Sequence, residues 1–160
     1  MIHRTISCIV LGLAAAALLV PTASADQPIK EPLPFSDLTG QFCEDFQVLV
    51  HATDNKEVIH IFSSGVALIT GVLKVEVTNL ETGKTLALNI SGPGKISADG
   101  STISGSGRWL LFGEAGQLPG SGPGMMLVVG HLTLALGPAG IESIAVKGTT
   151  EDVCAALAAA

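Results

Sequence analysis

The sequence predicts an all-β protein, an antiparallel up-and-down β-barrel of about eight strands that ends in a short helical turn. Short segments of alternating apolar and polar residues recur along the chain, and turns rich in Gly, Asp or Asn separate them. No long crossover connection is evident, so we expect consecutive strands to pair as antiparallel neighbours, and about eight such strands close naturally into a barrel. A β-sandwich is the alternative fold.

The clearest hairpin lies near the middle of the chain. Apolar side chains alternate with polar ones over 73–78 and over 86–90, and residues 81–84 supply the turn. Placing Val77 opposite Leu88 puts the large apolar side chains of both arms on one face. A slip of one residue would expose all of them, so the alternation specifies the face that is buried.

The other strands follow from the same alternation and from the turns between them. We expect a turn over 53–57, a hairpin turn at Asp99-Gly100 and a Gly/Pro-rich loop, Glu114–Gly124, that is long enough to be a mobile flap. Residues 149–152 can cap a last helical turn through Leu157. Besides the hairpin arm over 86–90, strands are expected at 46–52, 58–63, 66–79, 95–98, 101–112, 125–136 and 141–148.

The first 25 residues have the pattern of a secretory signal peptide. A basic start, His3-Arg4, precedes an apolar segment over 6–20 and the small-residue site Ala23-Ser24-Ala25. The apolar segment is shorter than the ~20 residues that span a membrane, although an uncleaved N-terminal anchor is the alternative. We therefore expect a secreted protein, cleaved after Ala25 and without a membrane span in its mature form.

Composition and domain organisation agree with one exported domain. After cleavage, a Pro-containing arm or linker is expected over 26–42 and the β-barrel domain over 43–157. The chain has a net charge of −6 with scattered acidic residues. This balance disfavours binding to nucleic acid or to anionic lipid. The oligomeric state does not follow from the sequence.

Two cysteines, Cys43 and Cys154, remain after removal of the signal peptide, because Cys8 lies within it. In an oxidising compartment two cysteines most simply form a disulfide. A bond that closes a loop of about 110 residues would stabilise the fold by up to ~4–5 kcal/mol in the chain-entropy model. Two free thiols are the alternative.

The histidines are the candidate metal ligands. If the chain turns over 53–57, His51 lies directly opposite His60, with Cβ atoms ~5 Å apart, close enough to share a metal ion. A zinc site needs a third protein ligand, and no spacing brings His131 to this pair. The other interpretation is a hydrogen-bonded or exposed pair of histidines beside a sheet edge.

Candidate ligand-binding residues are Trp109, Arg108 and His131. A tryptophan at a barrel mouth can stack on a ligand, and the neighbouring Arg108 could pair with a ligand carboxylate. The alternatives are a Trp109 that fills one end of the core and an Arg108 that pairs with a surface acid. The sequence has no Gly-x-Ser-x-Gly and no other nucleophile motif, and we assign no catalytic residue and no cofactor.

The order of these features resembles a group of small exported actinobacterial proteins of unassigned activity. The resemblance is carried by turns and strand edges over most of the mature chain. The inferred barrel also looks like the barrels of allene-oxide cyclases and dirigent proteins, a likeness of architecture that does not carry function. The matching segments are Cys43, residues 55–57, 77–84, 91–94, 109–112 and 152–154.

Two classes of function remain open from the sequence, besides a purely structural or interaction role. The leading hypothesis is a non-enzymatic exported barrel that binds a small apolar ligand or a surface partner, since the interior pattern is apolar and no catalytic set is present. The rival is a cyclase-like or isomerase-like enzyme in which the barrel is a shaping cavity. It requires one or two inward-pointing polar side chains from the set His51, His60, His131, Glu76 and Arg108.

Overall fold

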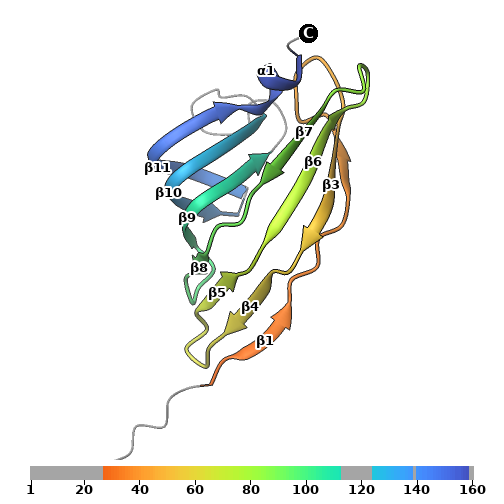
Figure 1. Cartoon of the computed structure of the whole chain (residues 1–160). Helices are drawn as coiled ribbons and strands as arrows, with labels where there is room; N and C mark the ends of the chain where they lie inside the picture. The colour runs from red at the N-terminus through yellow and green to blue at the C-terminus, as the bar shows by residue number, and fades with distance from the viewer. Residues whose placement is uncertain (1–26, 113–123, 139, 159–160) are drawn as a thin grey trace, which may run out of the picture.

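The computed structural model describes residues 27–112, 124–138 and 140–158. The expected signal peptide over 1–25 and nearly all of the expected flap over 114–124 lie outside these residues. The described chain forms two antiparallel sheets and one short helix (Figure 1). The elements are β1 (Ile29–Pro32), β2 (Leu38–Gly40), β3 (Val48–Asn55), β4 (Val58–Ile61), β5 (Ala67–Thr70), β6 (Leu73–Asn79), β7 (Thr85–Asn89), β8 (Gly94–Ile96), β9 (Thr102–Phe112), β10 (Met125–Gly137), β11 (Gly140–Asp152) and α1 (Val153–Ala158).

The two sheets share long chain segments. The strand order is β1-β4-β5-β8-β9-β10-β11 in the seven-stranded sheet and β2-β3-β6-β7 in the four-stranded sheet. β3 leads directly into β4 and β5 into β6, while β3 pairs with β6 and β4 with β5. The segment 48–79 is therefore one long hairpin that passes from one sheet into the other. β7 and β8 run along the β5–β6 arm of this hairpin, because β7 pairs with β6 and β8 pairs with β5.

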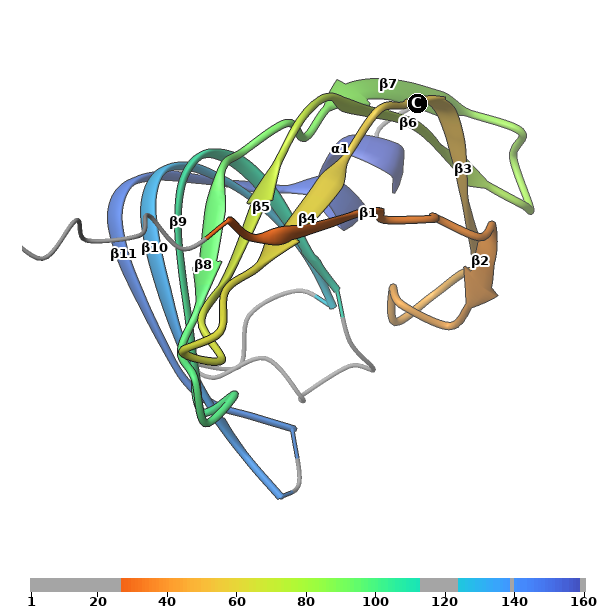
Figure 2. The same cartoon turned by 90° about the horizontal axis from the view of Figure 1, so that it is seen from below.

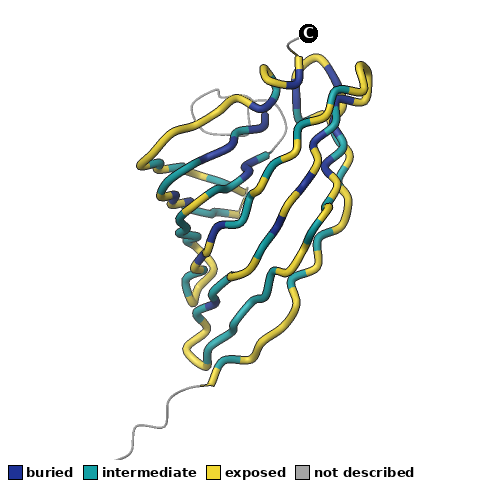
Figure 3. Tube along the Cα trace, viewed as in Figure 1, coloured by how far each residue is buried: buried dark blue, intermediate teal, exposed yellow. Residues whose placement is uncertain are grey.

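The main core lies between the four-stranded sheet, the first half of β10 and α1. Buried and exposed residues alternate along β6, as expected for a strand with one face on the core (Figure 3). Val77 of β6 is fully buried, and it belongs to one cluster with Leu127 of β10 and Leu157 of α1. Leu157 anchors α1, a helix too short to be stable without such packing.

A second cluster lies on the other face of β10. Leu127 and Val128 are neighbours in sequence and point to opposite faces, yet they are only 1% and 0% exposed. Val128 packs in a cluster with Leu111, Leu132 and Leu134. The first half of β10 is therefore covered on both faces.

A row of three glycines crosses the long strands of the seven-stranded sheet. Gly130 of β10 pairs with Gly107 of β9 on one side and with Gly148 of β11 on the other. All three have positive φ angles, 90° at Gly107, 138° at Gly130 and 155° at Gly148. The three strands curve together (Figure 2). Glycine permits this backbone conformation and the close approach of neighbouring strands, so the row provides a bend in the sheet.

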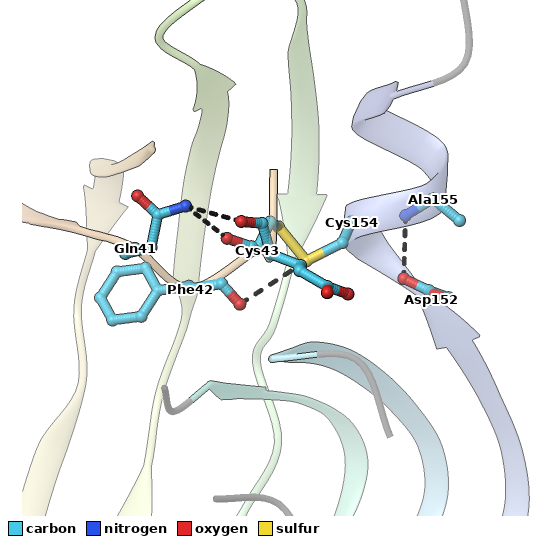
Figure 4. The surroundings of a disulfide bond; sticks show 7 residues. Gln41, Phe42, Cys43, Asp152, Cys154 and Ala155 are labelled. Carbon is cyan, nitrogen blue, oxygen red and sulfur yellow. Dashed lines mark hydrogen bonds between the residues drawn. A yellow bond between two sulfur atoms is a disulfide. The ribbon is translucent and has the colours of Figure 1, made fainter. Parts of the chain in front are cut away.

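The disulfide expected from the sequence is present. Cys43, in the connection between β2 and β3, is bonded to Cys154 of α1, with Cα atoms 5.6 Å apart (Figure 4). The Asp152 carboxylate accepts a hydrogen bond of 2.9 Å from the backbone N–H of Ala155, which caps α1 at its N-terminus. The disulfide therefore ties the start of the four-stranded sheet to the end of the seven-stranded sheet.

The all-β class, the antiparallel order of the strands and the C-terminal helical turn are confirmed. The sheets are not closed into a barrel, because among the described strands β11 pairs only with β10 and β7 only with β6. The two sheets form the sandwich-like arrangement instead. The expected arm over 26–42 pairs along the long hairpin, as β1 on β4 and β2 on β3.

The expected turn over 53–57 is wrong. The chain passes from β3 to β4 without reversing, and the reversal comes at 62–66, where the N–H of Phe62 donates to the carbonyl of Val66 at 3.0 Å. Gly71, on the opposite arm of the hairpin, has a φ of 129° and lies against the backbone of Lys56 and Glu57. The residues that look like a turn are thus an irregularity within a long strand pair, as the register shift in β3 also shows.

The other two predicted hairpin turns are found. The β6–β7 hairpin buries the expected face, although Val77 lies opposite Leu86 rather than Leu88. A shift of two residues leaves every side chain on its own face.

At the Asp99-Gly100 turn, Gly100 has a φ of 72°. Hydrogen bonds from Ser97 and Ser101 to the Asp99 carboxylate lower its pKa to about 2.

The glycine row predicts unequal effects of two alanine substitutions. Gly130→Ala and Gly140→Ala both place a side chain at a positive φ, at a cost of about 1–3 kcal/mol. A Cβ at residue 130 would also collide with the carbonyl oxygen of Lys147, whereas nothing lies within 4 Å of one at residue 140. This collision adds roughly 1–3 kcal/mol. Urea unfolding measures both losses, and equal losses would contradict the close approach of β10 and β11.

Candidate functional site

One face of the seven-stranded sheet is apolar from β4 to β9. Directly paired residues of antiparallel strands share a face, so the register identifies its members. Ile59 pairs with Ile69, and Ile96 pairs with Ile103. Ala67 connects the two pairs, because Ile61 and Ile96 lie on either side of it. We call this set the apolar face: Ile59, Ile61, Ala67, Ile69, Ile96 and Ile103.

The two ends of the apolar face are covered differently. Ile103, at the β9 end, packs against the second cluster with Leu132 and Leu134. The isoleucines of β4, β5 and β8 are partly exposed and pack against neither core cluster of described residues. This half of the face is therefore apolar surface that still contacts solvent. Its members are Ile59, Ile61, Ile69 and Ile96.

Trp109 lies on the same face, with its ring over a stretch of backbone that glycines leave without side chains. A Cβ at Gly94 would be 2.6 Å from the indole ring, and one at Gly92 or Gly105 would collide with it as well. The indole N–H donates a 3.1 Å hydrogen bond to the carbonyl of Ser106. The ring is thus held flat over β8 and β9, partly exposed, beside Ile96 and Ile103.

Arg108 points to the other face and makes a structural contact. Its Nε donates a 2.9 Å hydrogen bond to the carbonyl of Asn89, the last residue of β7. β7 and β9 are not paired with each other, since they belong to different sheets. Arg108 therefore connects the sheets where they separate, and it does not share a face with Trp109.

The expected opposition of His51 and His60 is wrong, because the turn between them does not exist. His51 lies opposite Glu76 and its Nδ1 is 2.9 Å from the Asp37 carboxylate, whereas His60 lies opposite Leu68. The two histidines occupy successive strands of one extended path. Within the described residues, no group of three or more His, Cys, Asp or Glu side chains is placed to hold a metal ion.

None of the five polar residues from which the enzyme hypothesis requires one or two inward-pointing side chains is buried. His51, Glu76 and His131 are exposed. His60 alternates with Ile59 and Ile61, so it faces away from the apolar face, and its Nε2 is 3.0 Å from Thr70 Oγ1. His131 pairs with Ser106 and Lys147 on the face opposite to Trp109.

Glu57 is a residue that the sequence did not single out. It precedes Ile59 by two positions and therefore lies on the same side of the strand, against the backbone of Gly71. Its partial burial raises the pKa of its carboxyl. The alternation of Ile59, His60 and Ile61 with Glu57 would have placed it on an apolar strand face, had the chain not been expected to turn there.

Comparison with models of protein families, with curated proteins and with solved structures finds no match for this chain. The resemblance to exported actinobacterial proteins therefore stays a prediction. No helix in the described part of the chain has the length and apolar character needed to cross a membrane.

The environment of Glu57 predicts a pH-dependent effect of Glu57→Gln. Because the folded-state pKa is raised, the folded chain loses stability as the pH rises from below 4.5 through that pKa. The variant removes this loss, so we expect a higher melting temperature than wild type at pH 7 and no gain near pH 3. Thermal unfolding at both pH values tests this. Glu81→Gln, in an exposed turn, is the control, and a similar gain there would contradict the assignment to Glu57.

Proposed function

We propose that this protein is an exported binding protein that holds a small apolar molecule on the apolar face, without a catalytic step. The supporting observation is the partly exposed half of that face, formed by Ile59, Ile61, Ile69 and Ile96. Contiguous apolar surface of this kind is characteristic of interaction sites. A ligand that covers these four side chains would remove apolar surface from water, which favours binding by about 25 cal/mol per Å².

Trp109 gives this surface a rigid aromatic border. The glycines beneath the ring and the hydrogen bond to Ser106 fix its orientation before any ligand arrives. A preorganised aromatic side chain contributes contact area at little cost in conformational entropy. The ligand is therefore expected to lie between Trp109 and the isoleucines of β4 and β5.

Two carboxylates restrict the charge of the ligand. Glu57 lies two positions from Ile59 on the same side of the strand, and Glu31 of β1 pairs directly with Ile59. An anionic group would be repelled at this end of the apolar face. The proposed ligand class is consequently a neutral or cationic molecule with an extended apolar part.

Export is part of the same proposal. The Cys43–Cys154 disulfide supports it, because such bonds persist in oxidising compartments. The signal-peptide pattern over residues 1–25 and the resemblance to exported actinobacterial proteins support it from the sequence.

The test uses Trp109, the single tryptophan of the chain, as the energy donor to a neutral apolar probe. Titration with N-phenyl-1-naphthylamine is expected to give saturable energy transfer with one site per chain. Ile59→Ser removes part of the apolar face and should weaken binding about tenfold or more, which corresponds to roughly 1.4 kcal/mol of lost burial. His60→Ser, on the opposite side of the same strand, should leave the affinity unchanged.

Both variants must melt within a few degrees of wild type for the comparison to hold, and Ile69→Ser serves in place of Ile59→Ser otherwise. Absence of saturable transfer would overturn the ligand proposal. Equal weakening by Ile59→Ser and His60→Ser would show that the probe binds elsewhere.

A further inference from the structure

β11 is a long strand with one unpaired edge. It has 13 residues and pairs only with β10 among the described strands. The other edge strands, β1, β2 and β7, have four, three and five residues. Short edges are one of the ways in which proteins avoid pairing with other chains, and β11 departs from it.

The C-terminal half of β11 is the accessible part of this edge. Residues 147–152 are exposed, and α1, which follows them, contacts β10 and β6. Lys147 and Glu151 lie on the same side of the strand, because they are four positions apart. Neither forms an ion pair with another described residue.

We propose that this edge pairs with β11 of a second copy of the chain, antiparallel and about a two-fold axis at Thr149. If the two-fold axis is perpendicular to the sheets, the same face of each sheet lies on the same side of the dimer. The residue on the axis then lies opposite its own copy in the partner subunit. With Thr149 at the axis, Lys147 lies opposite Glu151 of the partner subunit, and the symmetry forms this ion pair twice. Opposite charges directly across a strand pair stabilise the pairing.

Neighbouring registers do not match the charges. An axis at Lys147 places like charges opposite each other, and an axis at Gly148 places Lys147 opposite a threonine.

The expected complex is a weak dimer. A pair of short strand segments is small beside the ~1,200–2,000 Å² of a standard stable interface, so dimerisation should depend on protein concentration. Pairing through Lys147 and Glu151 should also weaken at high salt. The proposed dimer is independent of ligand binding, because the edge of β11 and the isoleucines of β4 and β5 lie at different positions of the sheet.

Sedimentation velocity of the purified protein over a range of concentrations tests the proposal. We expect a monomer–dimer equilibrium for wild type, and Lys147→Glu and Glu151→Lys should each weaken the dimer about tenfold or more, since two attractive pairs become repulsive. The double variant carrying both changes restores opposite charges and should recover the dimer. Lys95→Glu, at an exposed residue of β8, is the control and should behave as wild type.

A wild-type protein that stays monomeric at every concentration would overturn the proposal. A dimer that the single variants leave intact, or that the double variant fails to restore while it remains folded by circular dichroism, would overturn the Thr149-centred register.

Discussion

The Cys43–Cys154 disulfide joins the two ends of a meander that the hydrogen bonds between described strands leave open. The long segments β3–β4, β5–β6 and β7–β8, followed by β9, β10 and β11, pair in chain order, and the sheets separate where β7 and β9 diverge. The disulfide from the β2–β3 connection to α1 and the hydrogen bond from Arg108 to Asn89 both span this separation. The main core lies behind the disulfide, with Cys43 itself only 1% exposed. The disulfide therefore keeps α1 packed on β6 and β10.

The shape that results explains why one half of the apolar face is left uncovered. The bend at the glycine row brings the ends of β9, β10 and β11 into the two clusters on either face of β10. β4, β5 and β8 extend beyond those clusters, since they are continuations of strands whose other halves form the four-stranded sheet. Their isoleucines share a face with the second cluster without being buried by it. The candidate site therefore results from the division of the meander into two sheets.

Local patterns predicted the local structure well and the long-range arrangement less well. Alternation identified the buried face of the β6–β7 hairpin, and turn chemistry identified Asp99-Gly100. Asn55-Lys56-Glu57 has the composition of a turn, yet Gly71 on the opposite arm lets the strand continue, which no local pattern reveals. The opposition of His51 and His60 failed with that turn, and the isoleucine surface beside Glu57 was missed for the same reason. Barrel closure depends on the shape of the whole sheet, so strand number alone could not decide it.

The most direct test of the role of the disulfide is the free energy of unfolding in urea of a Cys43→Ala, Cys154→Ala double variant, measured beside the oxidised wild type. We expect a loss of about 2–5 kcal/mol, because the unfolded chain is then no longer constrained over a loop whose ends are 111 residues apart. Loss of the buried Cys43 side chain adds to it. A variant whose stability stays within about 0.5 kcal/mol of wild type would contradict the claim that this bond holds the ends of the meander together.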